Sequence, residues 1–237
     1  MPVIYCLDLN AVNVEPSWIT DEILEASRSY KNNDKRREFI ASQWLRRKVL
    51  SRHLGISARE LQFYHDDRGR PFVLYQDATL DFNISHSGSW LVMAISESGK
   101  LGVDIERIKR RINTMEIAKR YFSEDEFQWL WSLPENERDK GFYRLWTLKE
   151  ASLKLTGQGI AHGLDQHVFF IEDHICCFPE SNNNYHSFIF FDDYILSICC
   201  EDTIDKIHWS FVEQNGSIQR LDQCDNITEA LKSHIES

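Results

Sequence analysis

The chain repeats one order of structural elements, and this repeat constrains its fold more than any single motif does. Trp44 and Trp146 each lie 11 residues before a glycine that can end a helix. Apolar segments that begin at Trp90 and Tyr194 follow these tryptophans by 46 and 48 residues. Each half therefore combines a long helix with a later apolar strand. The repeat predicts two α+β units of about 100 residues each, with a ligand cleft between them.

Local patterns place the elements of the two units. Apolar residues recur at three- and four-residue steps over Asp34–Leu54 and again over Phe142–Leu155, which predicts two long helices. Residues 82–96 predict a hairpin with a polar tip at Ser85–Ser89. Further expected elements are strands at 3–9 and 101–105, helices at 113–121 and 124–131, antiparallel strands up to about residue 212, and a short helix after Thr228. We place the two halves at 1–103 and 104–237, the second with a polar tail.

Composition limits the class of protein. Hydrophobic residues make up 42% of the 237 residues, enough for a substantial core, but no apolar run reaches the ~18 residues that cross a bilayer. The first residues lack the basic and apolar pattern of a secretory signal. The six cysteines are therefore interpreted as reduced thiols of a cytoplasmic protein. A net charge of −10 argues against general nucleic-acid binding.

The positive charge is concentrated in one stretch. Between Arg28 and Arg52 there are nine basic and two acidic residues. Two interpretations fit this pattern: a helix face exposed to solvent, or a local binding site for a small polyanion. A second basic cluster, Arg107–Arg111, follows the strand expected at 101–105.

Two short motifs carry the chemistry. Asp104 and Glu106 lie two residues apart in a strand-like segment, so both carboxylates point to one face. Neighbouring carboxylates repel each other unless a cation lies between them, and Mg²⁺ prefers oxygen ligands and retains sites for a phosphate. Glu150 and Lys154 are four residues apart on a helix and share a face. An acidic outer strand face and a routine surface ion pair are the simpler interpretations of these motifs.

A third motif is Ser85-His86-Ser87-Gly88. As a turn, it offers hydroxyls, an imidazole and backbone N–H groups to a phosphate. A plain hairpin turn and a Ser–His nucleophile pair are alternatives, but the chain has no G-x-S-x-G elbow to support the second.

In order and spacing, these motifs resemble one family. F-N-I-S-H-S, G-V-D-I-E, F-S-x-x-E and W-T-L-K-E-A-S-L-K follow one another between about Asp34 and Gly159. This series resembles the Sfp-type 4'-phosphopantetheinyl transferases. The resemblance implies an α+β fold of two pseudo-symmetric halves, each a small antiparallel sheet packed on a long helix. It also implies a monomeric enzyme that moves the 4'-phosphopantetheine arm of coenzyme A to a serine of an apo acyl or peptidyl carrier protein and releases 3',5'-ADP.

The resemblance also implies a role for each site residue. Asp104, Glu106 and Glu150 would hold Mg²⁺. Lys154 and His86 would neutralise phosphate charge, and Ser85 would help to hold the nucleotide. The remaining expected contacts with coenzyme A are made by Arg70, facing the nucleotide phosphates, and by Arg36, Arg37 and Arg47, holding the 3'-phosphate. Glu126 would be structural or position a water, and Arg107–Arg111 with Ile112 and Met115 would dock an acidic carrier helix.

Two other functions fit parts of the pattern. A metal-dependent phosphodiesterase or nuclease also uses a D-x-E pair with a distant acid and lysine, although the net charge of −10 argues against it. A catalytically degenerate module that only binds carrier proteins is the third alternative. In such a module some of the polar positions would be lost, whereas here every expected one is filled.

Overall fold

The structure is a computed structural model of the chain. It describes residues 1–11, 20–67, 69–75, 80–109, 113–157, 163–172, 175–178, 181–191, 193–203, 206–213 and 215–221. Every structural statement below concerns these residues. None of their helices is both long and apolar enough to cross a membrane.

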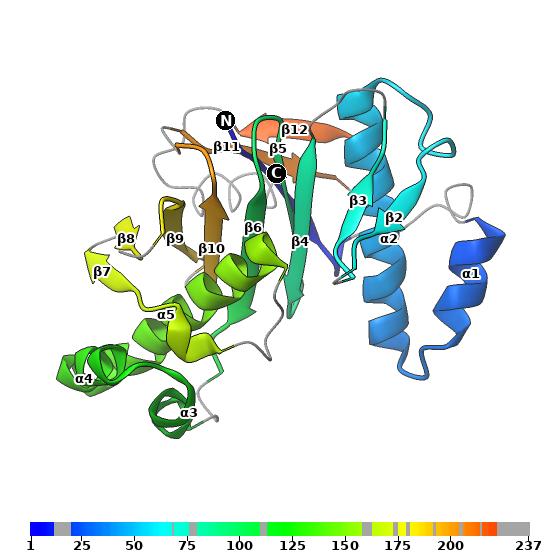
Figure 1. Cartoon of the computed structure of the whole chain (residues 1–237). Helices are drawn as coiled ribbons and strands as arrows, with labels where there is room; N and C mark the ends of the chain where they lie inside the picture. Colours follow the sequence, from blue (N-terminus) through cyan, green and yellow to red (C-terminus); the bar gives the residue numbers. More distant parts are fainter. Residues whose placement is uncertain are drawn as a thin grey trace.

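The first sheet has five strands in the order β12-β11-β1-β5-β4. These strands are β1 (Val3–Asp8), β4 (Asp81–Ser87), β5 (Trp90–Ser96), β11 (His208–Val212) and β12 (Ile218–Leu221). All neighbours pair antiparallel except β1 and β11, which are parallel. The long helix α2 (Asn33–Leu54) lies against this half, with α1 (Asp21–Arg28) and the hairpin of β2 (Phe63–His65) and β3 (Pro71–Val73) beside it (Figure 1).

The second sheet is antiparallel and has the order β6-β10-β9-β8-β7. Its strands are β6 (Leu101–Arg107), β7 (Phe170–Glu172), β8 (Ile175–Cys177), β9 (Asn184–Phe190) and β10 (Tyr194–Cys200). Helices α3 (Thr114–Tyr121), α4 (Glu124–Ser132) and α5 (Glu135–Thr156) accompany it, and a 3-10 turn, η3, spans Leu164–Gln166 (Figure 1).

The two sheets confirm the predicted repeat. Helix α2 begins at residue 33 and α5 at residue 135, and each ends at a left-handed glycine, Gly55 or Gly157. The order β1-β5-β4 of the first sheet returns as β6-β10-β9 in the second. Within this repeat Tyr5 pairs with Met93 as Asp104 pairs with Ser197. The fold is therefore α+β with two similar halves.

Three apolar clusters hold the layers together. One lies between the two sheets and contains inward residues of β1, β5, β6 and β10. The second joins the first sheet to α2, and the third joins the second sheet to α3, α4 and α5. The layer order is therefore helix, sheet, sheet, helix, and the free cysteines Cys6, Cys199 and Cys200 are buried within it.

Several expected bounds were wrong. Helix α5 begins at Glu135 rather than Phe142. Its first seven residues carry no apolar side chain, so they show no apolar period from which a helix could be predicted. Ser85–Ser87 lie in strand β4, and the hairpin tip is Gly88-Ser89. Strand β11 joins the first sheet instead of extending the second. The proposed division after residue 103 falls inside β6, and the helix expected after Thr228 lies outside the described residues.

Gly102 permits the close approach of β6 to α5. A Cβ at this position would lie 1.9 Å from the carbonyl oxygen of Ala151 and 2.8 Å from the amide nitrogen of Leu155. Both atoms are backbone, so they cannot move without shifting the helix. Glycine is needed here for space, and it allows β6 and α5 to bring their polar side chains together.

We expect Gly102→Ala to lower the free energy of unfolding by about 3 kcal/mol, because the new methyl group must push α5 away from β6. Urea unfolding at equilibrium measures this change. Gly55→Ala is the control, because its Cβ would meet nothing within 4 Å and only its positive φ of 67° is unfavourable. That control should cost about 1 kcal/mol. Equal costs for the two variants would contradict the packing argument.

Candidate functional site

The two chemical motifs meet where β6 faces α5. The side chains of Val103 and Ile105 enter the core between the sheets, so the alternate residues Asp104 and Glu106 take the other face of β6. The Nζ of Lys154 donates to Asp104 Oδ1 at 2.7 Å and to the Val103 carbonyl at 3.1 Å. The structure thus brings the strand motif and the helix motif into direct contact.

Three carboxyl groups share this buried space. Asp104 is 5% exposed and Glu150 is 7% exposed. Burial, and then the charge of Asp104, raise the pKa of Glu150 to about 7, against the opposing effect of Lys154; Glu106 adds a smaller increase. Burial also raises the pKa of Glu106. One ammonium group therefore faces an excess of acids that are poorly solvated.

The donor set fits a hard divalent cation. Asp104 Oδ2 and Glu150 Oε1 are buried oxygens without a hydrogen-bond partner, and carboxylate oxygen is the ligand type that Mg²⁺ prefers. In the described part of the chain, no three His, Cys, Asp or Glu side chains are already arranged to hold a metal by themselves.

Strand β4 brings residues of the first half to this site. Ser85 Oγ donates to Asp104 Oδ1 at 2.7 Å, and Ser87 Oγ donates to Glu106 Oε2 at 2.7 Å. His86 points to the other side of β4, where its Nδ1 lies 3.7 Å from Glu38 Oε2 on α2. Burial lowers the pKa of His86, and Glu38 opposes this effect. The site therefore lies at the contact between the two halves.

The three arginines expected to hold one phosphate lie in different places. Arg36 Nε donates to Ser27 Oγ at 3.3 Å, and Arg37 donates to the carbonyl of Leu9. Arg47 donates to Gln43 at 3.0 Å and lies over the Phe63 ring, 4.8 Å from its centre. Residues 36 and 47 share a helix face but are separated by about 16 Å along the axis. In the structure, each of the three guanidinium groups has a different protein partner.

Arg47 lines a basic cavity of about 570 Å³ between α1, α2 and β2. Arg46 and Arg59 line the same cavity. The Nε of Arg46 is buried without a hydrogen-bond partner, and burial lowers the pKa of this guanidinium to about 10. Three guanidinium groups in one cavity favour an anionic ligand.

Arg70 has protein partners in place of the expected phosphate. Its Nη2 lies 2.6 Å from Asp81 Oδ2 and donates to the Leu101 carbonyl at 2.7 Å. Its Nη1 donates to the carbonyls of Lys154 and Leu155, in the last turn of α5. Unpaired carbonyls at a helix end attract such donors. Arg70 thus ties the β2–β3 hairpin to α5, and we do not assign it to the nucleotide.

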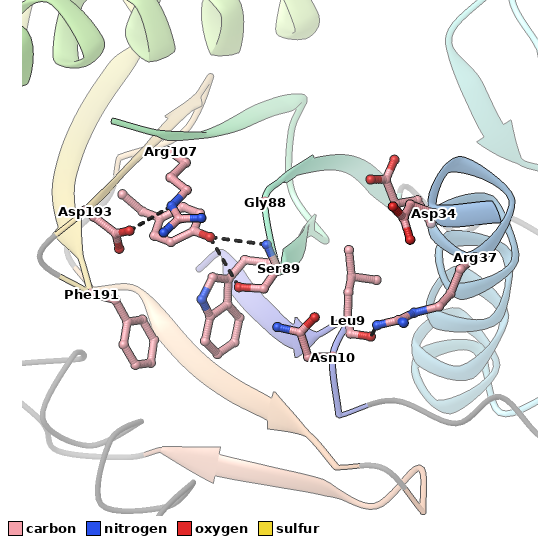
Figure 2. A pocket seen from close by; sticks show the side chains of 12 residues that line it. Leu9, Asn10, Asp34, Arg37, Gly88, Ser89, Arg107, Phe191 and Asp193 are labelled. Atoms are coloured by element: carbon pink, nitrogen blue, oxygen red, sulfur yellow. Dashed lines mark hydrogen bonds and ion pairs between the residues drawn. The ribbon is translucent and has the colours of Figure 1, made fainter. Parts of the chain in front are cut away.

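A second cavity, of about 610 Å³, opens beside the β4–β5 tip (Figure 2). It is lined from both halves, by Arg37 and Glu38 of α2, the β4–β5 tip, Arg107 and the β9–β10 turn. Arg107 forms an ion pair with Asp193 at 2.8 Å, and the Tyr194 hydroxyl accepts from the Ser89 amide at 3.2 Å (Figure 2). The remaining arginines of the predicted carrier dock, Arg110 and Arg111, lie outside the described residues, as does Ile112.

Four residues that matter to the site were not predicted. Ser87 holds Glu106, and Glu38 faces His86. Gly102 lets α5 approach, and Lys149 forms a buried ion pair with Glu126 at 2.8 Å. Ser87 and Gly102 lie in motifs that the sequence shows, and Lys149 stands beside Glu150 in the K-E pair. The contacts that give all four residues their roles join distant elements, so the sequence does not show them.

The fold and the site define a class: a two-half α+β protein with a buried acidic cluster and a lysine at the contact between its halves. Family comparison identifies the class more closely. Residues 100–217 match the model of the 4'-phosphopantetheinyl transferase superfamily. Residues 17–98 match the model described as 4'-phosphopantetheinyl transferase, N-terminal. The chain belongs to the 4'-phosphopantetheinyl transferase superfamily.

Curated relatives agree with this assignment. The chain is 35% identical over 144 residues to the 4'-phosphopantetheinyl transferase HetI of Nostoc sp., covering 60% of each protein. It is 34% identical over 150 residues to Sfp of Bacillus subtilis, covering 63% of this chain and 65% of Sfp. The match thus spans less than two thirds of these relatives. The crystal structure of Thermotoga maritima holo-[acyl-carrier-protein] synthase superposes on 43% of this chain and 61% of its own, with a TM-score of 0.35 and 19% identity.

Proposed function

We propose that this protein transfers the 4'-phosphopantetheine arm of coenzyme A to a serine of an apo carrier protein and releases 3',5'-ADP. The observation that carries the proposal is the buried cluster of Asp104, Glu106 and Glu150 against Lys154, with two carboxylate oxygens left without partners. In a member of this superfamily, such a cluster suits a pyrophosphate bound with a divalent cation.

The acidic residues and the lysine of the site have separate proposed roles in the reaction. Asp104, Glu106 and Glu150 would hold Mg²⁺, which supplies charge neutralisation and Lewis-acid activation of the pyrophosphate when bound. Lys154 attracts the same phosphate group as a point charge. Glu150 and a metal-bound water are the two candidate bases for the proton of the attacking serine.

The cavities suggest where the substrates lie. The basic cavity at Arg46 and Arg47 suits the phosphorylated nucleotide end of coenzyme A. The cavity of Figure 2, which is lined by Arg37 and Arg107 from the two halves, suits an acidic segment of the carrier protein. We place docking of an acidic carrier helix on the Arg107–Arg111 segment, and we propose a cytoplasmic monomer.

Mass spectrometry of a purified apo carrier protein tests the proposal. With the chain, coenzyme A and Mg²⁺, the carrier should gain the mass of one phosphopantetheinyl group. Asp104→Asn, which keeps the side-chain shape but loses the charge, should leave the carrier unmodified over the same period. An unmodified carrier across a panel of fatty-acid, polyketide and peptide-synthetase types would refute the function.

A further inference from the structure

The edges of the two sheets are joined by side chains rather than by backbone pairing. Strand β4 is the last strand of the first sheet, and β6 is the last strand of the second. The two strands lie next to each other (Figure 1). An edge strand carries a row of unpaired N–H groups, and buried N–H groups need acceptors. The outward N–H groups of β6 therefore need partners from β4.

Alternate side chains of β4 supply these acceptors. Asp81 Oδ2, Asn83 Oδ1, Ser85 Oγ and Ser87 Oγ accept from the amides of residues 101, 103, 105 and 107, at 2.8, 3.1, 3.4 and 3.0 Å. We call this set the β4–β6 ladder. Each rung joins residues 20 apart, so the ladder fixes the register of β6 against β4.

Two of the four β4 side chains, Ser85 and Ser87, also donate a hydrogen bond. A hydroxyl can accept one hydrogen bond and donate another. Ser85 and Ser87 donate to Asp104 Oδ1 and Glu106 Oε2, each at 2.7 Å. Each carboxylate thereby has one oxygen held from β4, while Asp104 Oδ2 is left buried and without a partner. In the described part of the chain, Ser87 is the side chain that donates to Glu106, whereas Asp104 accepts from both Ser85 and Lys154.

We propose that Ser87 is a positioning residue that fixes the Glu106 carboxylate for cation binding. The inference rests on the proposed function, because it assigns Ser87 to the metal site of that reaction. Ser87 touches neither substrate nor reacting atoms in this role. It acts through Glu106, as partners of metal ligands commonly do. Its donated hydrogen bond also favours the ionised form of Glu106, against the burial that raises the pKa of that group.

Binding of Mn²⁺ in the presence of coenzyme A, followed by electron paramagnetic resonance, tests the role of Ser87. Ser87→Ala should weaken Mn²⁺ binding by about 10-fold, the usual size of a lost partner of a metal ligand. Ser87→Thr keeps the hydroxyl and should restore binding. In the transfer reaction, Ser87→Ala should raise the Mg²⁺ concentration needed for half-maximal rate, while the rate at saturating Mg²⁺ stays close to that of the wild type.

Asn83→Ala is the matched control. It removes a rung of the same ladder, the one at Val103, but Asn83 donates to no carboxylate of the site. This variant should lower the unfolding midpoint and leave Mn²⁺ affinity unchanged. If Asn83→Ala weakens Mn²⁺ binding as much as Ser87→Ala, or if Ser87→Ala binds like the wild type, the positioning role is refuted. A wild-type protein that binds no Mn²⁺ would instead refute the proposed metal site, and the role of Ser87 with it.

Discussion

Replacement of Glu150 by glutamine is expected to stabilise the metal-free protein at pH 8 and to remove most of its transfer activity. The carboxyl of Glu150 is buried beside Asp104, and its pKa is raised from 4.5 to about 7. At pH 8 the folded protein must therefore hold a poorly solvated charge. Glutamine has nearly the same shape and never ionises, so the variant avoids this unfavourable energy.

The sign of the pH dependence follows from the raised pKa. Below pH 4.5 the carboxyl is protonated in the folded and the unfolded chain, and it does not disfavour folding. Between pH 4.5 and about 7 the carboxyl is ionised in the unfolded chain but mostly protonated in the folded chain. The free energy of unfolding of the wild type therefore falls as the pH rises through this range. The total loss is up to about 3 kcal/mol. Glu150→Gln should therefore exceed the wild type at pH 8 and match it near pH 4.5.

Urea unfolding in EDTA at several pH values measures the stability effect, and carrier modification with Mg²⁺ measures the activity. The transfer rate should fall by about 100-fold or more, because both a cation ligand and a candidate base are lost. Glu137→Gln is the control: this side chain lies in the first turn of the same helix, is 44% exposed, and should change neither quantity. A Glu150→Gln protein that is less stable than wild type at pH 8 would show that the carboxylate is already well compensated.

Local signals predicted the elements, and periodicity predicted the face of each acid. The capping box of Ser123 and Glu126 begins α4 as expected. The two-residue step in β6 placed Asp104 and Glu106 on one face of the strand, and the four-residue step in α5 placed Glu150 and Lys154 on one face of the helix. Such patterns are contained within one element, so a sequence shows them directly.

Contacts between elements could not be predicted in this way. In the sequence, the polar residues at the end of β4 resemble a turn. The sequence does not show that β6 lies beside β4 and that the amides of β6 donate to these side-chain oxygens. The family resemblance assigns Arg70 to a phosphate. Its partners in the structure, Asp81 and the end of α5, are distant in sequence, so the sequence does not show them. Lysine side chains are usually exposed, yet that of Lys149 is fully buried. In each case the three-dimensional neighbour decides the role.

Replacement of Lys149 by methionine is the second change with a large expected effect. The Nζ of Lys149 lies 2.8 Å from Glu126 Oε1 and donates to the carbonyls of Leu164 and His167 at 2.7 and 2.6 Å. Methionine fills a similar volume but offers no donor. Two carbonyls would lose this donor. Glu126 would lose its countercharge, although its Oε1 would still accept from the Phe169 amide at 2.9 Å. Removing one member of a buried ion pair typically costs about 3–5 kcal/mol, and we expect a loss of this size in urea unfolding.

Lys140→Met on the same helix is the matched control. Lys140 lies 3.5 Å from Glu137, but both side chains are more than 40% exposed, at 41% and 44%. Exposed pairs of this kind contribute about 0.5 kcal/mol, so the control should unfold almost like the wild type. Glu126→Gln should recover part of the loss when it is combined with Lys149→Met, because no charge is then left unpaired. Additive losses in the double variant would show that the two residues stabilise the fold independently and not as a pair.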